Sequence, residues 1–265
     1  MTHVDQRRLM KVPEITVLFW IAKLISTAFG EATSDYVFFN DYIGQHLAIL
    51  LGLCFLLACL LLQFSTRRYT PWVYWLSVTA VSIFGTMSAD FLNKDLGMPL
   101  YASTVMLLVL QTAVFIAWWR TAKTLDVHSI NTNVKELFYW LTVLFTFALG
   151  TAAGDFAAGT LGLGTLTSAF VFLAVILLPA AGYKLFGLNE VLAFWLAYTI
   201  TRPLGASIAD WLAVPAPYGD GLQIGTGPIS LTFGILLLAA VAALDLRHRN
   251  AKVTDPSTVM ARTSA

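Results

Sequence analysis

The chain has 265 residues, of which 58% are hydrophobic and 12% are charged, whereas an average soluble domain is about 45–50% apolar and about 25% charged. Sixteen Lys and Arg against fifteen Asp and Glu give a formal charge of +1, so no overall field favours nucleic acid as a partner. Cys54 and Cys59 lie in one apolar run and indicate neither a disulfide framework nor a metal clip. The composition excludes an ordinary soluble domain, and the expected partner is the lipid bilayer.

Apolar stretches long enough to cross a bilayer recur along the whole chain. A hydrocarbon core about 30 Å thick requires roughly 20 apolar residues per helix. The predicted spans are about 14–36, 42–63, 71–91, 98–119, 135–156, 161–183, 189–211 and 224–245. We therefore expect an all-α membrane protein with eight transmembrane helices. Residues 1–12 are expected to be a cytoplasmic N-terminal segment, 13–245 a single transmembrane domain and 246–265 a disordered cytoplasmic tail.

Lys and Arg sort to one side of the predicted membrane. If both termini are cytoplasmic, thirteen basic residues outside the spans face the cytoplasm and only Lys94 faces the other side, while Lys23 and Arg202 lie inside spans. This distribution follows the positive-inside rule. The sequence therefore predicts a multi-pass protein whose two termini are both cytoplasmic.

One pattern occurs four times: an aromatic residue, Trp, nine residues, Gly, four residues, Asp and an aromatic residue. Its copies are FWIAKLISTAFGEATSDY, YWLSVTAVSIFGTMSADF, YWLTVLFTFALGTAAGDF and FWLAYTITRPLGASIADW. The repeated residues are Trp20, Trp75, Trp140 and Trp195, then Gly30, Gly85, Gly150 and Gly205, then Asp35, Asp90, Asp155 and Asp210. The repeats span about 13–65, 69–121, 133–185 and 188–245. Since each holds two spans, we expect four parallel repeats that are pseudo-symmetric about an axis along the membrane normal.

These segments, with KVPEIT near the start and RPLGAS in the last repeat, resemble the bacterial membrane proteins built from four tandem two-span repeats with a signature Trp. That family is one of unknown function, and the resemblance covers about residues 11–245. It implies eight spans and a location in the bacterial inner (plasma) membrane. It implies no activity, so the function has to be argued from the residues.

The repeated aspartates share a helix face with further polar residues. Every fourth residue of a helix lies on nearly one face, so the first repeat aligns Lys23, Thr27, Glu31 and Asp35. The predicted ion-binding residues are Glu31, Asp35, Asp90, Asp155, Asp210, Thr86, Thr151 and Ser207, with the five carboxylates as metal ligands. Such oxygen ligands suit hard ions, so we expect a bound divalent cation such as Mn²⁺ or Mg²⁺ and no other cofactor.

Other residues of the repeats have a structural and a functional interpretation. The aspartates lie near the ends of their spans, where each could instead cap the next segment. The glycines are expected to permit close helix packing, with local unwinding as the alternative. The tryptophans are expected to be anchors at the membrane surface. Glu14, Glu136 and Glu190 are expected to complement helix dipoles at the starts of spans, with an inner mouth for cations as the alternative.

Two buried cations distinguish the first and last repeats. Lys23 and Arg202 are expected to balance charge, with Glu31 and Asp210 as their partners. Pro203 should kink the seventh span, which makes this region a gate or a static packing feature. His46 is an auxiliary ligand, a proton carrier or a structural residue.

The sequence predicts a transporter that moves a small cation, a metal ion coupled to protons, through an acidic site. The alternatives are a transporter of a small amine-like organic solute and a structural or regulatory membrane protein. We expect no enzyme, because the chain contains no HExxH motif, no GxSxG motif in a span and no paired His and Asp. A homo-oligomer is left open.

Overall fold

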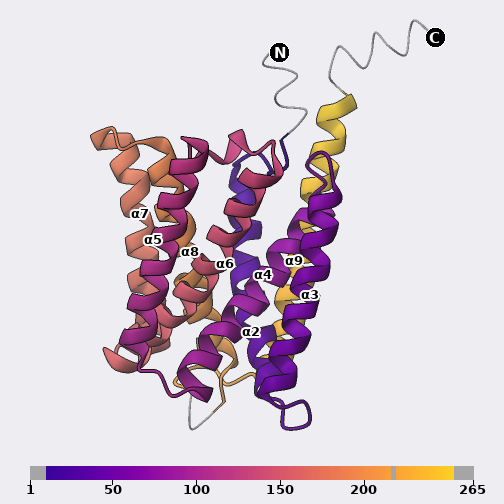
Figure 1. The fold of residues 1–265 in the computed structure, drawn as a ribbon. Helices are drawn as coiled ribbons and strands as arrows, with labels where there is room; N and C mark the ends of the chain where they lie inside the picture. The colour runs from indigo at the N-terminus through magenta and orange to yellow at the C-terminus, as the bar shows by residue number, and fades with distance from the viewer. Residues whose placement is uncertain (1–9, 216–218, 254–265) are drawn as a thin grey trace, which may run out of the picture.

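A computed structural model describes residues 10–215 and 219–253 of the chain. Within these residues it contains eight long helices and no strand. The long helices are α2 (Val17–Phe38), α3 (Gln45–Ser65), α4 (Pro71–Asp90), α5 (Leu100–Ala122), α6 (Asn133–Asp155), α7 (Gly164–Phe186), α8 (Glu190–Ala213) and α9 (Thr226–Val253). The π-helical turns η1 (Phe91–Asp95) and η3 (Phe156–Thr160) extend α4 and α6, and the 3₁₀ turn η2 (Val127–Ser129) precedes α6. The long helices lie side by side, and α2 begins at the end of the molecule where α9 finishes (Figure 1).

Local sequence explains where several helices begin and end. The side chains of Thr16, Thr132 and Asn189 accept hydrogen bonds from backbone N–H groups in the first turns of α2, α6 and α8, as N-capping residues do. Pro71 stands in the first turn of α4, where its missing N–H costs nothing. Gly187 ends α7 in the left-handed conformation. The helices agree with the predicted spans to within a few residues at most ends.

The C-terminal prediction is wrong in part. Helix α9 continues to Val253, so residues 246–253 are helical and do not belong to a disordered tail. The apolar face of this helix packs on α2, and the helix continues past its apolar part through Arg247 and Arg249. Residues 254–265 and 1–9 lie outside the described residues.

Four inner helices, one from each repeat, form the centre of the fold. Helix α2 packs against α4 and α8, and α6 packs against the same two helices. Each outer helix packs mainly on the inner helix that follows it in the chain: α3 on α4, α5 on α6 and α7 on α8, while α9 packs on α2. The repeats therefore interlock, because the second helix of one repeat covers the first helix of the next.

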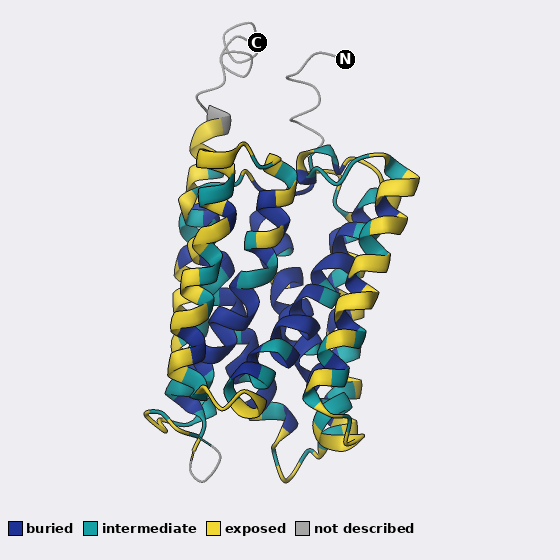
Figure 2. Ribbon diagram, turned by 90° about the vertical axis from the view of Figure 1, so that its left-hand side faces the viewer, coloured by how far each residue is buried: buried dark blue, intermediate teal, exposed yellow. Residues whose placement is uncertain are grey.

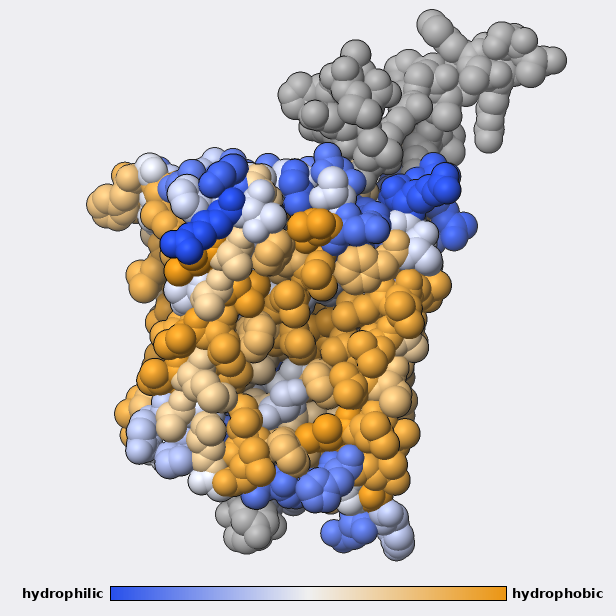
Figure 3. All heavy atoms as spheres, viewed as in Figure 1, coloured by the Kyte–Doolittle hydropathy of each residue, from blue (hydrophilic) through white to orange (hydrophobic). Residues whose placement is uncertain are grey.

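Burial follows this division into inner and outer helices. The dark blue of buried residues fills the middle of the molecule, and yellow exposed residues follow the outer helices (Figure 2). Seven of the eight long helices in the described part are long and apolar enough to cross a membrane. The exception is α2, which carries Lys23, Glu31 and Asp35. The face seen in Figure 3 has a hydrophobic band with hydrophilic residues at both ends, as expected of a membrane protein.

The basic residues gather at the end of the molecule where α2 begins. Arg67, Arg68, Arg120, Lys123, Lys135, Lys184, Arg247 and Arg249 lie at or near the helix ends on that side. Lys94, in η1, lies at the opposite end. Among the described residues outside the middle of the helices, the charge asymmetry expected from the sequence is therefore present in the fold.

Candidate functional site

Each repeated glycine lies where two neighbouring inner helices touch. A Cβ atom on Gly30, Gly85, Gly150 or Gly205 would meet, in that order, Ser82, Phe147, Arg202 and Thr27. Each of these residues stands three positions before the glycine of the neighbouring repeat, and the fourth repeat faces the first. The helices continue through all four glycines. The glycines therefore lie at close helix contacts, and none of them unwinds its helix.

An aromatic layer joins the four inner helices. The repeated tryptophan of each repeat packs against the aromatic residue that precedes the tryptophan of the repeat beside it. Ring centroids are 5.8 Å apart for Phe19 and Trp75, 5.6 Å for Tyr74 and Trp140, 6.1 Å for Tyr139 and Trp195, and 5.7 Å for Phe194 and Trp20. These separations are favourable for aromatic pairs. The expectation of anchors at the membrane surface is wrong for Trp75, Trp140 and Trp195, which are buried against neighbouring inner helices, while Trp20 is half-buried.

A buried ion pair between Lys11 and Glu136 lies at the end of the molecule where α2 begins. Lys11 Nζ lies 2.5 Å from Glu136 Oε2, and Gln63 Nε2 donates a hydrogen bond of 2.9 Å to Glu136 Oε1. Glu136 lies in the first turn of α6, as does Glu190 in α8. Glu136 is also almost fully buried. Through Lys11 and Gln63 it connects α6 with the segment before α2 and with α3, in addition to lying at a helix N-terminus.

Lys23 lies beyond the aromatic layer, inside the bundle. Its Nζ is 3.9 Å from the centroid of the Phe147 ring and 4.3 Å from that of Tyr198, an arrangement that stabilises a cation. No described residue accepts a hydrogen bond from this ammonium group, which is buried. The expected pair with Glu31 does not form, since eight residues of one helix separate the two by about 12 Å.

Arg202 and Glu31 form a buried ion pair between α8 and α2. The same Nη2 of Arg202 donates hydrogen bonds to the hydroxyls of Thr86 and Thr151, the latter at 2.7 Å. Arg202 is fully buried and Glu31 is 3% exposed. The expected partner of Arg202 was Asp210 on its own helix. The structure corrects this expectation, because Glu31 reaches the guanidinium from the neighbouring helix.

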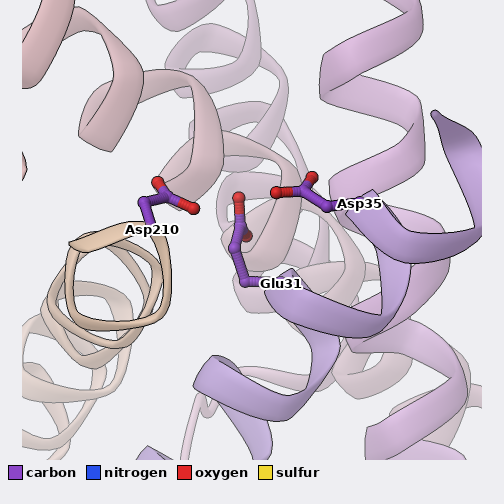
Figure 4. A group of neighbouring side chains, drawn as sticks. All are labelled: Glu31, Asp35 and Asp210. Atoms are coloured by element: carbon purple, nitrogen blue, oxygen red, sulfur yellow. The ribbon is translucent and has the colours of Figure 1, made fainter. Parts of the chain in front are cut away.

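Glu31, Asp35 and Asp210 bring three carboxylates together (Figure 4). One oxygen of each lies within 4.8 Å of the others, so some point lies within about 2.8 Å of all three, near the 2.3–2.6 Å of calcium–oxygen bonds. Asp35 is buried, and its Oδ1 has no hydrogen-bond partner among the described residues. Neither Asp35 nor Asp210 forms an ion pair within the described part of the chain.

The other two repeated aspartates do not join this group. Lys94 Nζ lies 2.6 Å from Asp90 Oδ1, so a cation of the chain itself already faces Asp90. Asp155 is half-buried and lies outside the carboxylate group. The expectation of an acidic site formed by all four aspartates therefore needs correction: two of them gather with Glu31.

No hydrogen bond supports the alternative role of Asp90 and Asp155, in which each would cap the segment that follows it. Asp90 and Asp155 precede η1 and η3, yet neither side chain accepts a bond from the following backbone. Ser207 Oγ is buried and has no hydrogen-bond partner among the described residues, so it forms no hydrogen bond with a carboxylate of the group. Pro203 lies inside α8 against Gly150 of α6, and exposed His46 packs on Phe91.

Sequence reasoning missed the role of Lys94. Asp90 and Lys94 are four residues apart, which places them on one face only if the helix continues beyond the aspartate. The predicted span ended at residue 91, whereas η1 carries the helix on to Asp95. The spacing was therefore a usable signal that the predicted helix boundary concealed.

A groove lies between α2, α7 and α8, away from the group of Glu31, Asp35 and Asp210. Its volume is about 1190 Å³, and its lining includes Trp20, Leu24 and Leu204. Glu14 and Glu190 line it at the end where α2 and α8 begin. It combines apolar walls with acidic and basic groups at one end, since Asp126, His128 and Lys135 also line it there.

Comparison with known proteins identifies the repeat family. A family model described as Repeat of Unknown Function (DUF347) matches four times, over residues 18–69, 73–124, 138–187 and 193–250, and each match contains one copy of the Trp, Gly and Asp pattern. No curated protein and no solved structure matches the chain. The expectation of a family of four tandem repeats of unknown function is confirmed, and the chain belongs to the Repeat of Unknown Function (DUF347) family.

Proposed function

We propose that the chain is an integral membrane transporter that binds a hard divalent cation between Glu31, Asp35 and Asp210 and exchanges it for protons. The observation that carries this proposal is the meeting of three carboxylates inside a helical bundle, where two of the three have no ion-pair partner among the described residues. Mn²⁺, Mg²⁺ and Ca²⁺ are the substrates that this ligand set fits.

Charge and burial support a cationic ligand. Transferring a carboxylate from water into a protein interior is unfavourable unless a partner compensates, and like charges this close repel each other. Glu31, Asp35 and Asp210 carry three negative charges when ionised, and Arg202 balances one of them through its ion pair with Glu31, which leaves two negative charges in excess. A divalent cation would balance them, and bound protons would balance them when the cation has left.

The repeat contacts support the arrangement in the membrane. We infer that all eight long helices cross the bilayer, with α2 shielded by α4, α8 and α9. The same glycine contacts and aromatic pairs recur between all four neighbouring inner helices, which supports pseudo-symmetry about an axis along the membrane normal. The gathering of basic residues at one end supports a bacterial inner membrane protein with both termini in the cytoplasm.

A second candidate substrate is a small organic amine. The groove between α2, α7 and α8 carries three carboxylates, Glu14, Asp126 and Glu190, beside Lys135 and His128 at one end, and mostly apolar walls elsewhere. An ammonium group would meet the carboxylates, and an apolar body would meet Leu24 and Leu204. This candidate uses a different part of the molecule, so one variant can separate it from the cation proposal.

The experiment is a melting curve of the purified protein with Mg²⁺, Ca²⁺, Mn²⁺, Na⁺ or an alkylammonium salt. A ligand at 100 times its Kd should stabilise the protein by about 2.7 kcal/mol. We expect one divalent ion to stabilise the wild type saturably and an Asp35→Asn, Asp210→Asn double variant not at all. Asp155→Asn is the matched control, because it removes a repeated aspartate outside the group, and it should respond as the wild type does.

Flux into proteoliposomes then tests transport of the ion that binds. A wild type that no divalent ion stabilises, or a double variant that responds like the wild type, would overturn the proposal. Stabilisation by alkylammonium alone, lost in Glu14→Gln, Glu190→Gln, would favour the amine candidate.

A further inference from the structure

The oxygens around Arg202 come from equivalent positions of three repeats. Glu31, Thr86 and Thr151 each follow the repeated glycine of their repeat by one residue. Their side chains converge on one nitrogen, Nη2 of Arg202. The fourth repeat has Ala206 at this position, and its cationic side chain comes from one turn earlier on the same helix.

The two hydroxyls present lone pairs to this nitrogen. Thr86 Oγ1 lies 3.0 Å from the Ser82 carbonyl oxygen, and Thr151 Oγ1 lies 3.3 Å from that of Phe147. When each hydroxyl proton is donated to its own helix, the oxygen is free to accept a bond from a cation. One carboxylate and two hydroxyl oxygens, from three helices, thus surround a single positively charged group.

Only one nitrogen of the Arg202 guanidinium forms hydrogen bonds with described residues, while the guanidinium carbon lies 5.4 Å from the centroid of the Phe147 ring. Arg202 Nε and Nη1 are buried and form no hydrogen bond with a described residue. A buried arginine that only holds a structure together normally uses more of its five N–H donors. The bonds of this guanidinium are concentrated on the one nitrogen that lies among the oxygens.

We propose that Glu31, Thr86 and Thr151 form an inner cation site that Arg202 Nη2 occupies in this structure. This inference rests on the proposed function and deepens it. The transported cation bound by Glu31, Asp35 and Asp210 competes with Arg202 for Glu31, and its inward movement requires Arg202 to leave. Arg202 therefore stands in for the substrate ion and keeps Glu31 neutralised when no ion is bound.

The test is cation affinity in an Arg202→Gln variant, measured by calorimetry on purified protein with the divalent ion that stabilises the wild type best, or with Mn²⁺ if none does. Removing the competing positive charge should tighten binding by about tenfold or more. Adding Thr86→Val should abolish that gain, because it removes an oxygen of the inner site. Arg202→Lys keeps the positive charge, but its side chain cannot reach all three oxygens. The Arg202→Lys protein should therefore bind the ion several-fold more tightly than the wild type. It replaces Arg202→Gln if the Arg202→Gln protein does not fold.

The outcomes separate this inference from the proposed function. If the wild type binds the cation and both Arg202 variants bind it with the same affinity, the inner site is overturned. The site formed by Glu31, Asp35 and Asp210 is then unaffected. No binding by any folded variant overturns both. Tighter binding in Arg202→Gln that Thr86→Val does not reduce shows a general effect of charge and also overturns the inner site.

Discussion

The aromatic layer and the end of the bundle that holds Glu31, Asp35 and Asp210 are built from the same four repeats, yet they differ in how closely the repeats agree. In the aromatic layer every repeat supplies the same kind of pair, and each pair makes the same contact with a neighbour. At the other end only the aspartate is common to all repeats. Glu31 and Arg202 occur in one repeat each, and Lys94 faces one aspartate of four.

This difference separates residues that hold the helices together from residues that carry chemistry. A contact needed at every helix interface is repeated four times, whereas a single binding site on a common axis needs each ligand only once. Glu31, which departs from the repeat, therefore distinguishes the two repeated aspartates that gather around it, Asp35 and Asp210, from the two that do not. Variants of the aromatic layer should therefore change stability, and variants of the candidate site should change cation binding.

The largest effect is expected in the aromatic layer. Trp140→Ala removes a buried ring that packs against Tyr74, and truncating a buried Trp costs about 3–5 kcal/mol. The melting temperature should fall strongly, while the cation affinity of the protein that remains folded should stay within about twofold. Trp119→Ala is the matched control, since Trp119 lies exposed on α5 and outside the layer. Equal losses in the two variants would contradict a structural role of the layer.

A smaller loss is expected at the glycine contacts. A Cβ on Gly85 would lie 2.7 Å from the Phe147 Cβ and 3.2 Å from the backbone nitrogen of Ala148, so α4 and α6 must separate to admit it. Gly85→Ala should therefore lower the free energy of unfolding by about 1–3 kcal/mol, as overpacking typically does. In Gly159→Ala the nearest atom, Leu100 Cδ1, is 3.8 Å away, an ordinary contact. Chemical unfolding in detergent should distinguish the two variants, and equal stabilities would show that the helices are not in close contact at Gly85.

The repeat pattern predicted much of this fold because each copy of the pattern lies on an inner helix that is followed by an outer helix. The positions of Trp, Gly and Asp identified the four inner helices and the face that they share. Helix ends were less predictable where the backbone departs from a regular α-helix, as at η1, which brings Lys94 onto the face of Asp90.

The pairing of charges was not predictable, because it depends on which helices are neighbours. Within one helix, Lys23 and Glu31 share a face, and so do Arg202 and Asp210. The circle of inner helices instead places α8 beside α2, so that Arg202 meets Glu31 across 171 positions of sequence. The burial of Trp75 and Trp140 has the same origin, since only the neighbouring helix determines whether an aromatic ring faces lipid or protein.

The smallest expected effect concerns a carboxylate that lies at the same end of the molecule as the cation site but outside it. Asp220, in the connection between α8 and α9, accepts hydrogen bonds from the backbone N–H of Thr165, at 2.8 Å, and from its hydroxyl, at the start of α7. Partial burial acts to raise the pKa of Asp220, but these hydrogen bonds outweigh it and lower the pKa. The folded state therefore favours the ionised form.

Asp220→Asn should reduce stability by about 0.3–1 kcal/mol at neutral pH, the usual worth of an exposed charge at a helix N-terminus. Because the folded-state pKa is lowered, this contribution is complete above the pKa of the unfolded chain, about 3.9, and disappears as the pH falls through the folded-state value. Melting temperatures of the wild type and the variant should thus differ at pH 7, and the difference should shrink as the pH falls below the pKa of the unfolded chain. The variant should bind the divalent cation as the wild type does, since Asp220 supplies no ligand. If it binds the ion more weakly, negative charge anywhere at this end of the molecule attracts cations, and the specific geometry of Glu31, Asp35 and Asp210 loses its importance.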